Sequence, residues 1–205
     1  MSTKQSESVT VTNRLERINK MIFNRYWAWP SADTFDIPPI GGFVKSYLRK
    51  SQISVDPFAR NKTWFNFTND LNPKTSAEYH MDAEAFLLML GERGTQADLI
   101  IFDPPYSPRQ IKECYEGFGR EVTNKDTQNG ALYNRVRRAI DPILAPNGYV
   151  LSFGWNTQGM SHITGLDYTI EEIVLVCHGV ARNDTICMAE KKSSQISLFT
   201  PPTDR

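Results

Sequence analysis

The chain has 205 residues and a mass of 23.4 kDa, which suits one domain that buries a sizeable core. Hydrophobic residues make up 40% and charged residues 22%, so the composition is that of a globular protein and excludes an intrinsically disordered one. Lys plus Arg and Asp plus Glu both total 23, and with a formal net charge of zero any surface that binds nucleic acid must be a local patch.

The first part of the chain is expected to carry little regular structure. Residues 1–20 are polar and read as a lead-in to the domain, and residues 21–43 are dense in aromatic residues and prolines. We expect this aromatic stretch to be irregular but packed. Trp27 and Trp29 read first as core or lid-packing residues and second as base-stacking ones. A short amphipathic helix is predicted next, at residues 42–50.

Strands then alternate with helices along the rest of the chain. The apolar patterns and turn residues predict strands at 52–58, 63–73, 97–102 and 149–155, helices at 83–90 and 130–148, and a β-hairpin at 168–192. This alternation predicts an α/β fold with a mostly parallel mixed sheet covered on both faces and the C-terminal antiparallel hairpin at one edge. One domain should span residues 21–199, and its ligands should bind beyond the carboxyl ends of the strands.

The chain carries no signal for a membrane, for secretion or for a metal. No apolar run approaches the roughly 20 residues of a membrane helix, and the polar N-terminus lacks the apolar stretch of a signal peptide. The three cysteines, Cys114, Cys177 and Cys187, form no CxxC pair and no even disulfide set. We therefore expect a cytoplasmic protein without a zinc site.

The segment "ADLIIFDPPYSPRQ", residues 97–110, carries the most specific signal. Two consecutive prolines fix φ and donate no backbone hydrogen bond, so the chain leaves a buried strand as a stiff segment. The Asp103 side chain and the Pro104 carbonyl are then two acceptors held side by side, which matches an exocyclic NH2 group. Tyr106 adds a flat face for a stacked base, a contact of about 1–3 kcal/mol. The alternative interpretation is an ordinary strand followed by a Pro-Pro turn.

Six motifs follow one another between residues 40 and 192: "SVDPF", "TNDLNP", "YHMDAEAFL", "ADLIIFDPPYSPRQ", "LAPNGYVLSFGWNTQG" and "HGVARNDTICMAEKK". With them the chain resembles the class I S-adenosylmethionine-dependent methyltransferases of the amino-methylating DNA group, above all compact phage- and prophage-type adenine-N6 methyltransferases. The resemblance implies a Rossmann-like fold, S-adenosyl-L-methionine as cofactor and DNA as substrate, with the target base flipped out of the duplex. Ribosomal-RNA guanine-N2 enzymes can carry the same DPPY tetrapeptide.

The resemblance also implies roles for residues around the cofactor. Asp56 would accept a hydrogen bond from the methionyl amino group, Asp70 would bind the ribose hydroxyls, and Asp82 would lie near the adenine amino group, with Phe86 or a neighbour against the ring. The set implied for the cofactor is Asp56, Pro57, Phe58, Ala59, Asp70, Asp82 and Asp103.

The catalytic pocket implied by the resemblance surrounds the target base and consists of Asp103, Pro104, Pro105 and Tyr106. Methyl transfer would be a direct in-line displacement, in which positioning does most of the work. No cysteine follows a proline, so the Pro-Cys nucleophile of the cytosine-C5 class is missing.

Two features depart from the family pattern. Family members carry a glycine-rich loop and a helix after the first strand, whereas this chain has no glycine between Asp56 and Asp70, which are fourteen residues apart. The loop at residues 59–63 must then hold the cofactor with Arg60, Asn61 or Lys62, or these are only solvated loop residues.

A separate target-recognition domain is also missing. Only residues 107–130 are available for substrate contacts, and Arg109, Gln110 and Lys112 are the candidates for contacts with phosphates or base edges. We expect a short or relaxed recognition sequence, or help from a second copy of the chain or a partner protein.

The remaining candidates have two interpretations each. His178 and Asn183 lie near the predicted hairpin tip, where a substrate contact and ordinary turn chemistry are both open. The arginines of the 130–148 helix, Arg135, Arg137 and Arg138, read first as a solvated face and second as phosphate ligands. The rival functions are methylation of an RNA base or of cytosine N4, and a catalytically silent module that keeps the fold for DNA binding or assembly.

Overall fold

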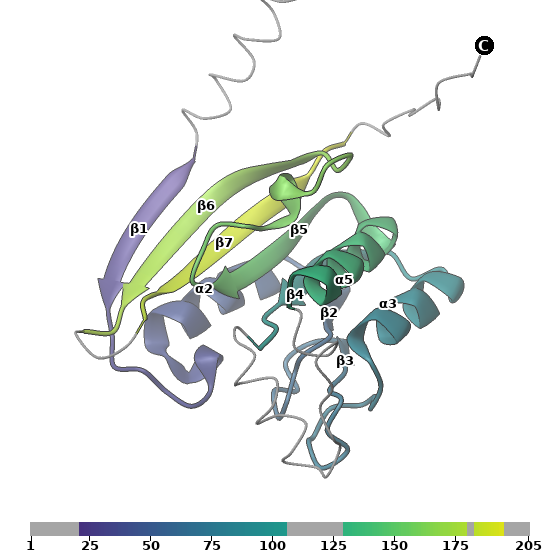
Figure 1. Ribbon diagram of the computed structural model, residues 1–205, viewed down its shortest axis with the longest axis horizontal. Coiled ribbons are helices and arrows are strands. Elements are labelled where there is room, and N and C mark those ends of the chain that lie inside the picture. Colours follow the sequence, from purple (N-terminus) through teal and green to yellow (C-terminus); the bar gives the residue numbers. More distant parts are fainter. Residues whose placement is uncertain (1–20, 106–128, 180–182, 195–205) are drawn as a thin grey trace, which may run out of the picture.

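The computed structural model describes residues 21–105, 129–179 and 183–194, which form a seven-stranded sheet with helices on both faces (Figure 1). In chain order the elements are β1 (Ile22–Trp27), η1 (Thr34–Asp36), α2 (Pro38–Leu48), β2 (Ser54–Asp56), β3 (Phe67–Thr68), α3 (Ala83–Glu92), β4 (Ala97–Phe102), α5 (Asn129–Ile143), β5 (Leu144–Gly154), η2 (Met160–His162), β6 (Tyr168–Cys177) and β7 (Thr185–Lys192). The strand order is β1-β6-β7-β5-β4-β2-β3, and all neighbours are parallel except that β7 is antiparallel to β5 and β6. The predicted mixed α/β fold with its antiparallel hairpin is confirmed.

The central strand β4 is buried on both faces. Leu99 and Ile101 pack into a core with α2, whereas Ile100 and Phe102 pack into a second core with α3 and α5. Figure 1 shows α2 on one side of the sheet and α3 and α5 together on the other. An inner parallel strand needs a continuous apolar run because both of its faces are covered, and this is why the strand could be predicted with its bounds.

The chain reverses its direction across the sheet between β2 and β4. From β2 it moves outward to β3 at one edge, and after α3 it returns to β4 on the other side of β2 and continues to β5. Open α/β sheets bind their ligands at such a switch point, beyond the carboxyl ends of the two strands, and we call this place the crevice. Asp56 ends β2 and Asp103 directly follows β4, so both aspartates lie at this crevice.

The connection between β2 and β3 contains no helix among the residues described. Instead, the Asn69 N–H donates to the Asp56 carbonyl at 2.9 Å, and the Ala59 N–H donates to the Asn69 carbonyl at 2.9 Å. β3 itself has only two residues, so this strand is shorter than the sequence pattern predicts.

The N-terminal aromatic stretch differs most from expectation. Residues 22–27 form β1, an edge strand parallel to β6, so the prediction of irregular structure there was wrong. The hairpin β6–β7 therefore lies inside the sheet and not at its edge. Trp27 and Trp29 are 68% and 89% exposed, so the prediction that they are packed was also wrong. The prolines that suggested irregular structure all follow the strand, whereas its aromatic and branched residues favour β structure.

The helix α5 ends at Ile143, with Pro142 in its last turn, and β5 begins at the next residue. The predicted range of this helix, 130–148, therefore extended too far. In the part of the chain that the structure describes, no helix is long and apolar enough to cross a bilayer.

Candidate functional site

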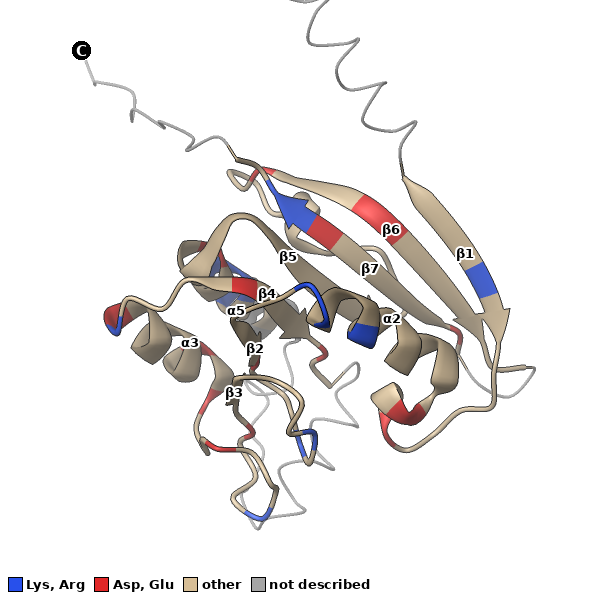
Figure 2. Cartoon of the chain, turned by 180° about the vertical axis from the view of Figure 1, so that it is seen from behind, with Lys and Arg blue, Asp and Glu red and all other residues tan. Residues whose placement is uncertain are grey.

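Four aspartates gather around the crevice beyond β2, β3 and β4, and we call them the acidic edge: Asp33, Asp56, Asp70 and Asp103. Figure 2 shows red segments in the loops beyond β2 and β3 and before α2. Val55 pairs with Ile100 in the β2–β4 register, so Asp56 is level with Ile101, and Asp103 lies two residues, or about 7 Å, further along. The sequence predicted three of these residues, but it gave Asp33 no role.

Asp56 is the most buried member of the acidic edge, with 1% of its surface exposed. Its Oδ1 accepts a hydrogen bond from the Phe58 N–H at 3.0 Å, whereas its buried Oδ2 has no partner among the described residues. Burial raises the pKa of Asp56 well above its usual value; the Phe58 N–H opposes this, and repulsion from Asp103, Asp70 and Asp33 adds to it. A buried carboxylate oxygen without a donor is costly, so this position suits a ligand that brings a cationic N–H donor.

Asp70 is oriented by two loops. Its Oδ2 accepts from the Arg60 N–H at 3.1 Å, and its Oδ1 accepts from the Asn72 N–H at 2.8 Å. Each carboxylate oxygen can accept a further hydrogen bond. Asp70 is therefore held in place by backbone groups while keeping acceptor capacity for hydroxyl donors.

In the glycine-poor loop after β2, the side chains of Arg60 and Lys62 bind to other residues of the chain. Arg60 adopts a positive φ of 50°, and its Nη1 donates to the Ala32 carbonyl at 2.8 Å. Lys62 Nζ lies 2.5 Å from Asp36 and 3.4 Å from Asp33. The hydrogen bond to Asp36 is the main reason that the pKa of Lys62 is raised. Arg60 and Lys62 therefore fasten this loop to the segment before α2, which is a structural role.

The turn between Asp56 and this loop is largely covered. Pro57 and Ala59 are buried and Phe58 is half-buried, with its ring edge-on to Phe102 at 6.0 Å. The three residues thus form an apolar wall between the carboxyl ends of β2 and β4.

Asp103 and Pro105 are half-buried and Pro104 is buried. The Tyr133 hydroxyl on α5 donates to the Pro105 carbonyl, and the Tyr133 ring lies edge-on to Phe102 at 6.1 Å. Helix α5 therefore fixes the Asp-Pro-Pro segment, which no sequence signal had indicated. Tyr106, Arg109, Gln110 and Lys112 lie outside the described residues.

Comparisons with known proteins identify the type of fold. No family model and no curated protein sequence matches the chain. Among solved structures, SMU.776, described as a methyltransferase and crystallised with SAH, matches with a TM-score of 0.52 and 13% identity, over 73% of this chain and 48% of the other. TrmN from Thermus thermophilus matches with a TM-score of 0.50 and 15% identity, over 76% of this chain and 49% of the other. The chain has the fold of class I methyltransferases.

The match is to the fold and not to the whole of these proteins. The chain spans about half the length of the two structures, 48% and 49%. The M. jannaschii tRNA m1G37 methyltransferase also matches, with 13% identity over 78% of this chain and 51% of the other, but a TM-score of 0.43 is too low to establish a shared fold.

In this methyltransferase fold, two residues suggested for the cofactor's adenine have structural roles. Asp82 caps α3, because its Oδ1 accepts from the Glu84 and Ala85 N–H groups at 2.9 and 3.2 Å. Phe86 is fully buried in the core beside Tyr79, so it cannot contact a ligand ring. Asp82 remains exposed at the helix N-terminus.

Of the two candidate substrate-binding residues near the β6–β7 hairpin tip, one has its side chain engaged within the chain. His178 is buried, and its ring nitrogens contact the Ala28 carbonyl and Thr185 Oγ1, both at 2.9 Å. Both nitrogens are thus engaged within the chain, which corresponds to a structural role. Asn183 is exposed near the same end of the sheet as the acidic edge and stays a candidate for substrate contact.

Arg137 is not part of a solvated helix face. Its guanidinium lies over the Phe102 ring at 4.9 Å and donates to the Gln158 carbonyl, whereas its buried Nε has no partner among the described residues. Burial lowers the pKa of Arg137, against the opposing effect of Glu190 and Tyr133. Arg135 pairs with Glu84 at 2.9 Å and Arg138 is exposed, so only these two fit the predicted solvated face.

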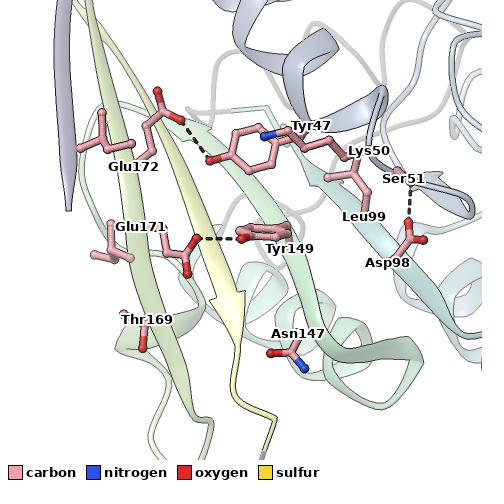
Figure 3. A pocket seen from close by; sticks show the side chains of 12 residues that line it. Tyr47, Lys50, Ser51, Asp98, Leu99, Asn147, Tyr149, Thr169, Glu171 and Glu172 are labelled. Atoms are coloured by element: carbon pink, nitrogen blue, oxygen red, sulfur yellow. Dashed lines mark hydrogen bonds between the residues drawn. The ribbon is translucent and has the colours of Figure 1, made fainter. Parts of the chain in front are cut away.

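A cavity of about 550 Å³ lies at the opposite end of the strands (Figure 3). A register shift at residues 170–172 of β6 places Glu171 and Glu172 on the same side, where Tyr149 donates to Glu171 at 2.7 Å and Tyr47 donates to Glu172 at 3.0 Å. Burial, together with the neighbouring glutamates, raises the pKa of both tyrosines. These polar groups satisfy one another, and the cavity is separate from the acidic edge.

Proposed function

We propose that this chain transfers a methyl group from S-adenosylmethionine to the N6 amine of adenine in DNA. The observation that carries the proposal is the buried Oδ2 of Asp56, which has no hydrogen-bond partner in the described ranges and lies beside Asp103-Pro104-Pro105 at the switch point of a methyltransferase fold. A carboxyl group that a cationic donor would ionise and a stiff pair of acceptors thus lie at one crevice.

The acidic edge fits the charge of the cofactor. S-adenosylmethionine supplies an electrophilic methyl group, and it carries an ammonium and a sulfonium. Asp56 would accept from the ammonium, which would supply the missing donor and favour the ionised carboxylate. Asp70 would accept from the ribose hydroxyls, Pro57, Phe58 and Ala59 would line the cofactor, and Asp82 would lie near its adenine.

Asp103 and Pro104 would hold the target amine. No hydrogen bond joins the Pro104 carbonyl to another residue in the described ranges, whereas the Pro105 carbonyl is taken by Tyr133. An exocyclic NH2 donates two hydrogens, one to the Asp103 carboxylate and one to this carbonyl, and both bonds increase the electron density on nitrogen. Tyr106 would stack on the base. The methyl group would then transfer in line from the sulfonium to the nitrogen, without a covalent enzyme intermediate. S-adenosylhomocysteine would leave as the neutral thioether, and the nitrogen would lose one N–H proton to solvent.

DNA must be held by surfaces other than the acidic edge, because carboxylates repel phosphates. The sequence offers Arg109, Gln110 and Lys112 for this role. With the target base flipped into the crevice, the duplex backbone stays outside it.

The proposal is tested in a methylation-deficient bacterial strain. Cells would express the intact protein, Asp103→Ala, or the control Glu171→Gln, which lies at the opposite end of the sheet. We expect N6-methyladenine in DNA with the intact protein and the control, and none with Asp103→Ala, measured by nucleoside mass spectrometry and long-read sequencing.

Other outcomes change the proposal in defined ways. N4-methylcytosine would keep the mechanism and correct the base, and methylated bases in RNA alone would correct the substrate. No modified nucleoside in DNA or RNA from cells that contain the folded protein would contradict the function.

A further inference from the structure

The strand β1 and the residues that flank it carry most of the large hydrophobic side chains that are exposed in the described part of the chain. Nine large hydrophobic residues are exposed in the described ranges, and six of them lie within nine consecutive positions. We call these six the β1 strip: Met21, Ile22, Phe23, Tyr26, Trp27 and Trp29. Exposed apolar side chains concentrated in one short segment mark a site of association rather than a solvated face.

The β1 strip lies at an open edge of the sheet. β1 pairs with β6 on one side, and no described strand pairs with its other side. Both faces of the strand are open as well, since Ile22 and Phe23 are neighbours that point to opposite faces and are 55% and 58% exposed. An exposed, apolar edge strand invites pairing with another strand.

The charge of the strip favours protein over nucleic acid. Arg25 is the only charged residue between residues 21 and 30, and Figure 2 shows β1 as tan with a single blue segment. Its Nε donates to Cys177 Sγ at 3.3 Å, and its guanidinium lies 5.2 Å from the centre of the Trp27 ring. A surface for a phosphate backbone needs several free cations, which the strip does not provide.

The area of the strip is close to what a stable dimer needs. The exposed fractions of its six residues run from 40% to 89%. An aromatic side chain has a surface of about 150–250 Å², so the exposed area of the six side chains is several hundred Å² per chain. This area is near the roughly 800 Å² that each partner contributes to a standard interface.

We propose that a second copy of this chain covers the β1 strip, with the two β1 strands paired antiparallel about a twofold axis. A twofold interface uses the same surface on both chains, and antiparallel pairing lets the open edge of β1 bond to its own copy. The two sheets join into one, and Phe23 and Trp27 of both copies lie on a shared face. Because the strands run in opposite directions, the two acidic edges face opposite sides, so each copy works on its own substrate.

The test measures the molar mass of the full-length protein by light scattering over a concentration series. We expect twice the chain mass of 23.4 kDa for the intact protein. Phe23→Asp with Trp27→Asp should raise the dimer dissociation constant by roughly 100-fold or more, as loss of a central aromatic contact does. The control Leu88→Asp changes an equally apolar residue on α3, which is 52% exposed, and should remain dimeric.

Two further measurements cover the case in which the aspartate variants do not fold. Trp29 lies outside the strand and is 89% exposed, so Trp29→Ser should leave the fold intact. The variant should nevertheless weaken the dimer. Hydrogen exchange of the β1 amides should slow as the concentration of the intact protein rises.

A monomeric intact protein at all concentrations would overturn the proposal, as would a dimer that the β1 variants leave unchanged. A monomer whose DNA affinity falls in the Trp27 and Trp29 variants would assign the strip to nucleic acid. A monomer in which the strip shields residues 1–20 from protease would assign it to the N-terminal segment.

Discussion

Asp56 has opposite effects on stability and on the proposed activity. Its carboxylate is buried near three other aspartates, and among the residues that the structure describes only the Phe58 N–H stabilises its charge. In a protein selected for stability alone, an uncharged side chain would be better here. The same burial makes Asp56 a strong acceptor for a cationic donor, because little solvent competes with the ligand.

The first prediction concerns the isosteric change Asp56→Asn. The raised pKa means that the folded protein binds this proton more tightly than the unfolded chain. The free energy of unfolding therefore falls as the pH rises from the usual aspartate pKa near 4 through the raised folded value. Asp56→Asn removes this fall, so the variant should be more stable than the intact protein at pH 7, by about 1–3 kcal/mol, and similar to it near pH 4. Urea unfolding at both pH values measures the difference.

A variant that is less stable than the intact protein at pH 7 would mean that Asp56 has a partner in the free protein. Parallel pH profiles for the two proteins would mean that its folded pKa is ordinary.

At the scale of elements, one buried glutamate ties the connection after β5 to β7. Glu190 is fully buried and accepts from the Met160 and Ser161 N–H groups at 2.8 Å, from Ser161 Oγ at 2.7 Å and from Ser152 Oγ at 3.3 Å. This holds η2 against the sheet, and the connection from β5 to η2 begins at the acidic edge. The connection can approach so closely because residue 159 has no Cβ.

The second prediction compares two glycines of this region. A Cβ on Gly159 would lie 1.9 Å from Glu190 Oε2, whereas a Cβ on Gly154 meets nothing within 4 Å. Gly159→Ala should therefore lower the free energy of unfolding by about 1–3 kcal/mol, and Gly154→Ala should change it by less than about 0.5 kcal/mol. Denaturant unfolding of both variants measures this, and equal effects would show that Glu190 does not hold the connection in place.

At the scale of the molecule, the sequence revealed the buried strands better than the exposed ones. Apart from Asp98, the run from Ala97 to Phe102 is apolar on both faces because it is an inner strand, so its pattern predicted its bounds and the place of Asp103. β1 was missed because it owes its regular structure to pairing with β6, about 150 residues away, and no local pattern encodes that pairing.

Only part of the candidate site could be predicted, because some of its residues come together through packing between elements. Aspartates at the ends of strands can be read from the chain, but the roles of residues on other elements depend on packing. Tyr133 and Arg137 lie beside the buried stripe of α5, and only the position of this helix over Phe102 brings them to the Asp-Pro-Pro segment. The missing donor at Asp56 is likewise a property of the assembled crevice.

The most direct test of the account is a calorimetric titration of S-adenosylmethionine into the intact protein, Asp56→Asn and the control Glu171→Gln. We expect binding by the intact protein and the control, with an affinity that rises with pH until the pH passes the raised pKa of Asp56, because the ligand binds the ionised form of this residue. We also expect a loss of at least about tenfold in affinity for Asp56→Asn, whose fold is checked by its unfolding curve. No binding by the folded intact protein, or equal binding by Asp56→Asn, would contradict the assignment of this crevice to the cofactor.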